Sequence, residues 1–272
     1  MWITLRARVG YQKGCYNMPS VDLFIPAAPK DYVKLPFVLD SVDRYLPDIT
    51  AAHIVTRKAI PPIIEIPTNG FRFSVQYHTD REVLDFDPQR FKFRPTWVYQ
   101  QFLKLFQQVT SDWYLVMDAD RFINGPQDLF DGEHPIMFLR DRDENHAPYF
   151  EYNRAMLGIG KVYPHTFLSE CTLYSRSQVE IMLLESGLTA DQWLMKSAEI
   201  ITRDCCIADA ELYGSYVFSR QPDLYRFKVL RDYMRGKYAN QGEWTSPQIA
   251  AYVEAMRGRD DVDFFTAHSW HD

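Results

Sequence analysis

The sequence predicts an α/β protein in which a mixed central sheet is flanked by helices and the second half of the chain is the more helical. Short β-favouring runs alternate with segments of helical spacing through the first half of the 272 residues. Hydrophobic residues make up 46% of the chain and charged residues 24%, the balance of a packed globular protein. Since the sequence contains neither an internal repeat nor a linker, we expect a single domain over residues 1–272.

The first predicted unit is a strand, a helix and a second strand. Residues 21–26 favour β-structure and end at a proline, and small residues follow in the next loop. Apolar positions recur at helical spacing over residues 31–46, where Asp31 is the expected N-cap. Residues 53–56 form the next strand, and this order implies a right-handed crossover and a parallel pair.

The clearest predicted helix spans residues 96–109, because its apolar positions form one stripe. The continuous apolar run 113–117 is typical of a strand covered on both faces, and it ends at Asp118. A turn signal at residues 124–126 precedes a further predicted strand at 135–139.

The rest of the chain is mostly helical in pattern, and residues 1–20 form an N-terminal extension or an extra strand. Capping and breaking residues delimit the later helices. The predicted elements are helices at 176–185, 190–201 and 209–219, a helix starting at Ser246, and a late strand at 262–266.

The charge balance and the cysteines exclude several classes of protein. A formal net charge of −6 repels phosphate backbones, so we expect no nucleic-acid partner. The four cysteines have neither zinc-site nor redox-pair spacing. No run reaches the roughly 20 apolar residues of a membrane span, and the N-terminus lacks the apolar core of a signal peptide. We therefore expect a cytoplasmic protein, with peripheral membrane contact left open.

Asp118-Ala119-Asp120 follows a predicted buried strand. Ligands of open α/β sheets bind beyond the carboxyl ends of the strands, so these carboxylates are placed to act on a ligand. Hard oxygen ligands suit Mg²⁺ or Mn²⁺ that also bridges substrate phosphates. The alternative interpretation is a solvated turn.

Three segments together resemble the GT-A glycosyltransferases, most closely little-characterised bacterial and viral members that carry a DxD motif. They are residues 21–26, residues 97–104 and residues 114–120, and a later segment, 211–214, resembles an acidic-aromatic-glycine segment of the same family. The resemblance implies a GT-A-like, Rossmann-like sheet with a nucleotide-sugar-binding half at 21–145 and an acceptor-binding half at 146–272. It also implies a metal-dependent glycosyltransferase that moves a hexosyl or pentosyl group from a nucleoside-diphosphate sugar, UDP-linked by family habit, to a hydroxyl of a glycan, glycolipid or glycoprotein.

The resemblance carries specific roles onto this chain. A histidine after the late strand would complete the shell of the Mn²⁺ or Mg²⁺ ion, and His268 is preferred to His271. The donor-binding residues implied are Pro26, Ala27, Lys30, Gln101, Lys104, Asp118, Ala119 and Asp120, and the metal ligands implied are Asp118, Asp120 and His268.

An inverting transfer needs a carboxylate that accepts the proton of the acceptor hydroxyl. The resemblance favours Glu211, with Asp209 as the nearby alternative. Stereochemistry, donor sugar, acceptor, linkage and oligomeric state are not fixed by the sequence.

Two other functions compete with the transferase. A sugar nucleotidyltransferase shares the layout, but the loop after the first strand lacks the glycine-rich, basic character that cradles a triphosphate. A non-catalytic glycan-binding protein of the same fold predicts no metal-dependent nucleotide binding.

Overall fold

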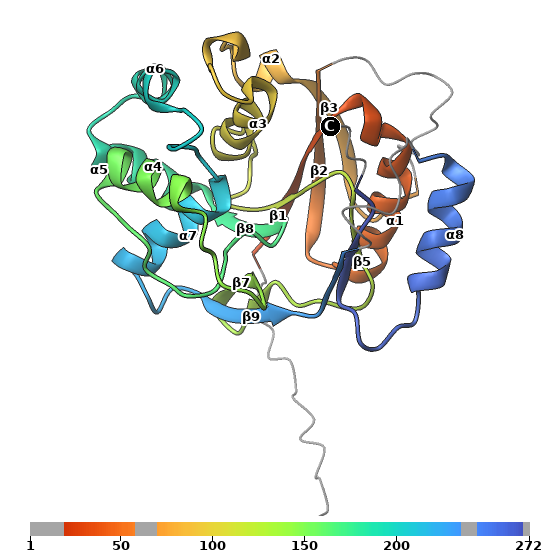
Figure 1. Ribbon diagram of the computed structural model, residues 1–272. Helices are drawn as coiled ribbons and strands as arrows, with labels where there is room; N and C mark the ends of the chain where they lie inside the picture. The colour runs from red at the N-terminus through yellow and green to blue at the C-terminus, as the bar shows by residue number, and fades with distance from the viewer. Residues whose placement is uncertain (1–18, 58–69, 235–243, 269–272) are drawn as a thin grey trace, which may run out of the picture.

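A computed structural model describes residues 19–57, 70–234 and 244–268, and its centre is a five-stranded sheet (Figure 1). The strand order is β3-β2-β1-β4-β8. The first four are parallel, and β8 runs antiparallel to β4. The strands are β1 (Val21–Ala27), β2 (Ile49–Thr56), β3 (Ser74–Thr79), β4 (Trp113–Met117) and β8 (Cys171–Ser175).

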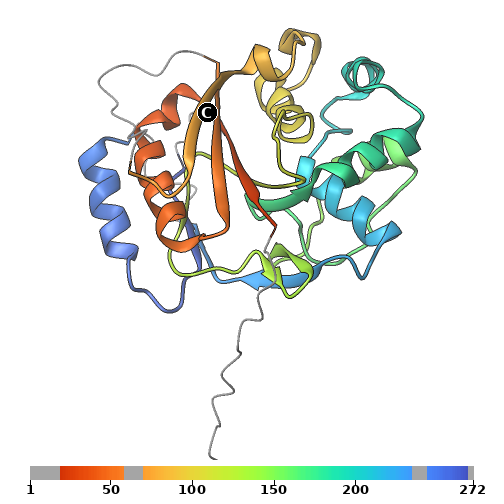
Figure 2. The same cartoon turned by 180° about the vertical axis from the view of Figure 1, so that it is seen from behind.

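Helices cover both faces of this sheet, as the two opposite views show (Figures 1 and 2). On one face lie α1 (Leu35–Tyr45) and α8 (Ser246–Met256), whose apolar residues share one buried cluster. A second buried cluster unites the helices of the other face. These are α3 (Pro95–Leu105), α4 (Ala147–Leu157), α5 (Arg176–Ser186), α6 (Ala190–Ile200) and α7 (Asp209–Arg220). The short helices are η1 (Pro29–Lys34), α2 (Asp80–Val83) and η2 (Pro88–Arg90).

The central strands β1 and β4 are mostly apolar because each of their faces meets a helical layer. In β1, Leu23 and Ile25 belong to the cluster on the α1 face, while Phe24 belongs to the cluster on the α3 face. In β4, Leu115 belongs to the cluster on the α1 face, and Tyr114 belongs to the cluster on the α3 face. This is the continuous apolar run expected of strands buried on both faces.

Two small sheets complete the fold. One has the order β10-β11-β5, and the other β6-β7-β9. Since β11 pairs antiparallel with β5, it brings the end of the described chain back to the segment that follows β4. The strands are β5 (Arg121–Ile123), β6 (Phe130–Asp131), β7 (His134–Arg140), β9 (Arg226–Leu230), β10 (Asp232–Met234) and β11 (Phe264–Thr266).

The structure confirms a mixed sheet flanked by helices and corrects the start of the first helix. Asp31 was expected to cap a helix beginning there, but it lies inside η1, and α1 begins four residues later at Leu35. The Asp31 carboxylate instead accepts a hydrogen bond from the Lys34 ammonium at 2.6 Å. The predicted N-terminal extension lies outside the described residues, except for its last two positions, 19 and 20.

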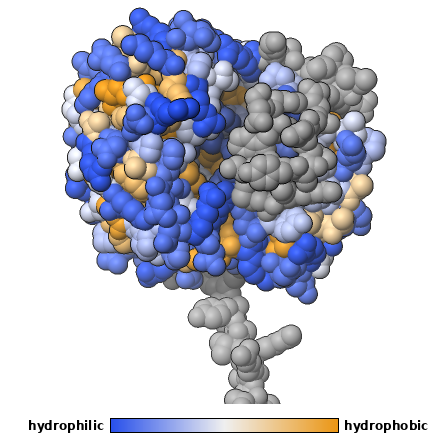
Figure 3. All heavy atoms as spheres, viewed as in Figure 1, coloured by the Kyte–Doolittle hydropathy of each residue, from blue (hydrophilic) through white to orange (hydrophobic). Residues whose placement is uncertain are grey.

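The face shown in Figure 3 is largely hydrophilic and hollowed near its middle. In the described part of the chain, no helix combines the length and the apolar character that crossing a membrane requires.

Gly214 in α7 allows this helix to pack closely against Phe167. A Cβ atom added at position 214 would lie 2.3 Å from the Phe167 ring. We therefore expect Gly214→Ala to lower the free energy of unfolding by about 1–3 kcal/mol, as overpacked cores do. Urea denaturation measures this, with Gly125→Ala as the control because a Cβ there meets nothing within 4 Å. Equal stability of the two variants would contradict the close packing.

Candidate functional site

A cavity of about 530 Å³ opens at the carboxyl edge of the parallel strands. It lies between α3, the ends of β4 and β7, the loop before β8 and the start of α7. This is the edge at which open α/β sheets bind ligands. Its walls include five of the residues predicted from sequence: Gln101, Lys104, Asp118, Asp209 and His268.

Lys104 of α3 joins two of the cavity's carboxylates. Its buried ammonium lies 2.8 Å from Asp118 Oδ1 and 3.7 Å from Asp209 Oδ1. Burial disfavours the charged ammonium, but the two carboxylates outweigh this effect and raise the pKa of Lys104. Lys104 is therefore a fixed positive charge in the wall of the cavity.

Asp209, the first residue of α7, is held by hydrogen bonds as well as by this ion pair. The Tyr174 hydroxyl donates to Asp209 Oδ2 at 2.5 Å. The Asp209 backbone N–H donates to Gln101 Oε1 at 3.2 Å, which gives Gln101 a positioning contact. Burial raises the pKa of Asp209, and Lys104 opposes the rise without cancelling it. A carboxylate with a raised pKa in a cavity is suited to accept a proton.

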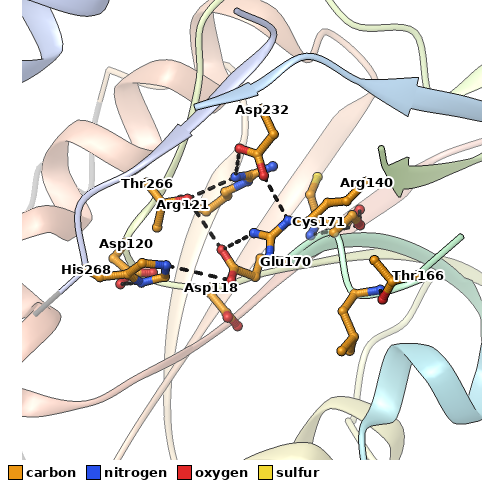
Figure 4. A network of polar contacts seen from close by, with 12 residues as sticks. Asp118, Asp120, Arg121, Arg140, Thr166, Glu170, Cys171, Asp232, Thr266 and His268 are labelled. Atoms are coloured by element: carbon orange, nitrogen blue, oxygen red, sulfur yellow. Dashed lines mark hydrogen bonds and ion pairs between the residues drawn. The ribbon is translucent and has the colours of Figure 1, made fainter. Parts of the chain in front are cut away.

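Asp120 and His268 form the second polar group of the site, shown in Figure 4. Their proximity follows from strand register, because Thr266 of β11 is paired with Arg121 of β5. His268 Nδ1 lies 3.0 Å from Asp120 Oδ2. Burial raises the pKa of Asp120, but the contact with His268 outweighs burial and lowers it. Lys34 adds a second, longer contact, at 3.9 Å from Asp120 Oδ2.

The donor set of Asp120 and His268 fits a divalent cation. Adjacent ligands of an octahedral ion at about 2.1 Å lie about 3.0 Å apart, and this separation also fits the direct hydrogen bond present. Among the described residues, no three His, Cys, Asp or Glu side chains are arranged as a metal site. Mg²⁺ commonly keeps water and ligand oxygens beside one or two protein carboxylates, so a third protein ligand is not required. Asp118 is held by Lys104 on the neighbouring wall.

Glu170 is a site residue that sequence reasoning missed. It precedes β8 with a backbone φ of 57°, a left-handed conformation that is uncommon outside glycine. Its Oε2 lies 2.9 Å from Arg140 Nη2, and its Oε1 lies 3.9 Å from His268 Nε2. Figure 4 shows these side chains beside Asp118 and Asp120. A strained residue at this place marks a geometry that the surrounding structure enforces.

The ion pairs continue away from the cavity into the small sheets. Asp232 accepts from Arg121 at 2.5 Å and lies 2.8 Å from Arg140. Arg121 is fully buried and also donates to the Thr266 hydroxyl at 2.9 Å. The network joins β5, β7, β10 and β11, so it fixes the wall that carries His268.

The predicted donor residues Pro26 and Ala27 line a second, smaller cavity of about 90 Å³ on the other side of α3. Gln100, on the helix face toward this second cavity, donates to the Pro26 carbonyl at 3.4 Å. Lys30 is exposed in η1, and Ala119 is buried between the two aspartates of its motif. Pro26 and Ala27 are therefore the predicted donor residues that meet this smaller cavity.

Glu211 lies outside the larger cavity, although it is only two residues beyond Asp209. It is 1% exposed, and one carboxylate oxygen accepts a hydrogen bond from the Phe167 backbone N–H at 3.2 Å. Burial raises the pKa of Glu211 to about 7. Of the two predicted bases, Asp209 is therefore the one placed to meet a ligand in this cavity.

The comparisons with known proteins add no relative. No family model matches the chain, and no curated protein matches its sequence. The arrangement itself defines the class of site: a polar, charge-rich cavity at the carboxyl edge of a mixed α/β sheet.

Proposed function

We propose that the protein is a metal-dependent glycosyltransferase that moves a sugar from a nucleoside-diphosphate sugar to a hydroxyl acceptor. The observation that carries the proposal is the convergence of Lys104, Asp118, Asp209 and His268 on one cavity, with Asp120 in contact with His268. A volume of about 530 Å³ is within the range of small-molecule sites, roughly 300–1,000 Å³. The resemblance to GT-A enzymes supplies the substrate class.

The donor is bound from both sides of α3 in this proposal. Asp120 and His268 would hold Mn²⁺ or Mg²⁺, and the ion would supply positive charge to the departing diphosphate. On the adjacent wall, Lys104 offsets the negative charge of Asp118 and Asp209, which would otherwise repel the diphosphate. The smaller cavity at Pro26 and Ala27 is mostly apolar and takes the base of the nucleotide, UDP by resemblance.

Asp209 accepts the proton of the acceptor hydroxyl. Its carboxylate lies in the wall of the cavity and has a pKa raised by burial, which brings its basicity closer to working pH. Tyr174 and Gln101 fix its side chain and its backbone, so the oxygen that receives the proton keeps one position. Asp118 and Lys104 keep that region polar.

Calorimetric titration of UDP and GDP, with and without Mn²⁺, tests the donor site. We expect one nucleotide to bind only with Mn²⁺, and Asp120→Ala to weaken that binding at least about 100-fold, because it removes a metal ligand. Asp128→Ala is the matched control, since Asp128 is an exposed aspartate outside the cavity.

Two results would contradict the proposal. Absence of nucleotide binding to the wild-type protein under every condition would favour a glycan-binding protein. Release of pyrophosphate from UTP and a sugar 1-phosphate, without sugar transfer, would make the protein a nucleotidyltransferase.

A further inference from the structure

Two arginines in the cavity wall, Arg94 and Arg142, have a role that the donor site does not use. Both line the larger cavity, and both are exposed. Within the part of the chain that the structure describes, neither guanidinium has an ion-pair or hydrogen-bond partner. Two unpaired guanidiniums on one cavity are notable in a chain whose net charge is −6.

The other cations of the cavity are neutralised from within. Lys104 is paired with Asp118 and Asp209. Arg140 is paired with Glu170 and with a carboxylate of the neighbouring sheet. The positive charge available to a ligand at this cavity therefore comes from the two arginines.

Arg94 has an unusual backbone conformation, and its side chain contacts the Trp97 ring. Its φ of 43° and ψ of 54° place it in the left-handed region, directly before Pro95. That conformation is costly for a non-glycine residue and more so before proline. Its guanidinium stacks on the Trp97 ring at 4.3 Å, which leaves the N–H groups at its edge free for a planar anion. The contact with the Trp97 ring is therefore what restricts the direction of this exposed side chain.

Arg142 lines the same cavity as Arg94 and lies in the segment that follows β7. Tyr149, in the first turn of α4, also lines the cavity. Burial raises the pKa of Tyr149 to about 12, and the positive charges of both arginines oppose that rise, so both act on this hydroxyl. Asp141 and Asp143 flank Arg142 in sequence and are exposed, but neither is within 4.0 Å of its guanidinium.

We propose that Arg94 and Arg142 bind an anionic group, a phosphate or a carboxylate, of the second substrate. Guanidinium groups bind both anions through paired N–H donors. Calling this second substrate the acceptor rests on the proposed function. The anion site itself does not depend on that function. The transferase therefore acts on a phosphorylated or acidic acceptor.

Titration of glucose 6-phosphate, glucuronate and glucose into the protein, each in the presence of saturating UDP and Mg²⁺, tests the site. We expect at least one anion to bind ten times more tightly than glucose, and Arg94→Gln and Arg142→Gln each to weaken that anion about tenfold or more. The two anions distinguish a phosphate from a carboxylate ligand. Arg176→Gln is the control and should change nothing, because exposed Arg176 lies at the opposite end of the sheet, where β8 ends beside the start of β4.

Three results would overturn the inference: equal binding of both anions and glucose, unchanged anion binding in both variants, or anion binding that appears only when UDP is left out. The last would assign the arginines to the donor diphosphate. Melting temperatures of the variants, followed by circular dichroism, separate misfolding from lost binding. If UDP fails to bind but the arginine-dependent anion binding persists, the proposed function fails and the anion site stands.

Discussion

Lys104→Met is expected to lower the free energy of unfolding by about 3–5 kcal/mol at pH 8, the cost of removing one partner from a buried ion pair. The ammonium lies 2.8 Å from Asp118 and 3.7 Å from Asp209, so its loss leaves two carboxylates without their cation. Without Lys104, the pKa of Asp209 should rise further, because this cation is what opposes the effect of burial. The destabilisation should therefore shrink as pH falls and the Asp209 carboxylate becomes protonated. Urea denaturation at pH 8 and pH 5 measures both effects.

Lys92→Met provides the baseline, because Lys92 is exposed and its loss should change stability by less than about 0.5 kcal/mol. In the double variant Lys104→Met with Asp209→Asn, part of the lost stability should return. The reason is that the buried Asp209 carboxylate, left without its cation by the loss of Lys104, is itself removed. A cost for Lys104→Met that equals the baseline, or that is the same at both pH values, would show that the lysine does not neutralise these carboxylates in solution.

The sequence predicted best those elements whose burial alone determines a simple pattern of apolar residues. The apolar run 113–117 is bounded by two aspartates, and it coincides with β4. The missed strand β8 is as deeply buried, but its sequence Cys-Thr-Leu-Tyr-Ser mixes hydroxyl and apolar residues and has neither alternation nor a long apolar run. The missed edge strand β3 is mostly exposed and polar, so no apolar face identifies it.

The site was predictable where local sequence fixes position. Gln101 and Lys104 are three residues apart on one helix and share a face, and Asp118 directly follows a strand. The pairing of Lys104 with Asp209 is a long-range contact between α3 and α7, and no local pattern contains it. His268 was placed by resemblance, and the pairing of β11 with β5 is the physical reason that it reaches Asp120.

The missed residues reached the site through topology. Glu170 precedes an antiparallel strand, and Cys171 pairs with Met117, so the start of β8 lies at the carboxyl end of β4. That direction could not be inferred without first finding β8. Arg94 looks in sequence like an ordinary surface arginine, and the left-handed backbone before Pro95 is what turns it to the cavity. Pairs of basic residues on irregular segments carry no periodic signal.

Glu211→Gln is expected to raise the free energy of unfolding by about 3 kcal/mol at pH 8 and to change it little at pH 4. Burial raises the pKa of Glu211 from 4.5 to about 7. Below pH 4.5 the folded and unfolded states both hold the proton. As pH rises from 4.5 to about 7, the unfolded state releases its proton first, and the wild-type protein progressively loses stability. Glutamine has no such loss, and its side-chain oxygen can still accept from the Phe167 backbone N–H. Thermal unfolding across this pH range measures the difference.

The same variant decides which carboxylate accepts the proton of the acceptor. Glu211 lies outside the cavity, so Glu211→Gln should retain transfer activity, whereas Asp209→Asn should lower kcat by about 100-fold or more, as loss of a general base does. Glu199→Gln, at an exposed glutamate, controls for the change of charge. A stable Glu211→Gln protein without activity would reverse the assignment and leave Asp209 with a structural role only, as the partner of Lys104 and Tyr174.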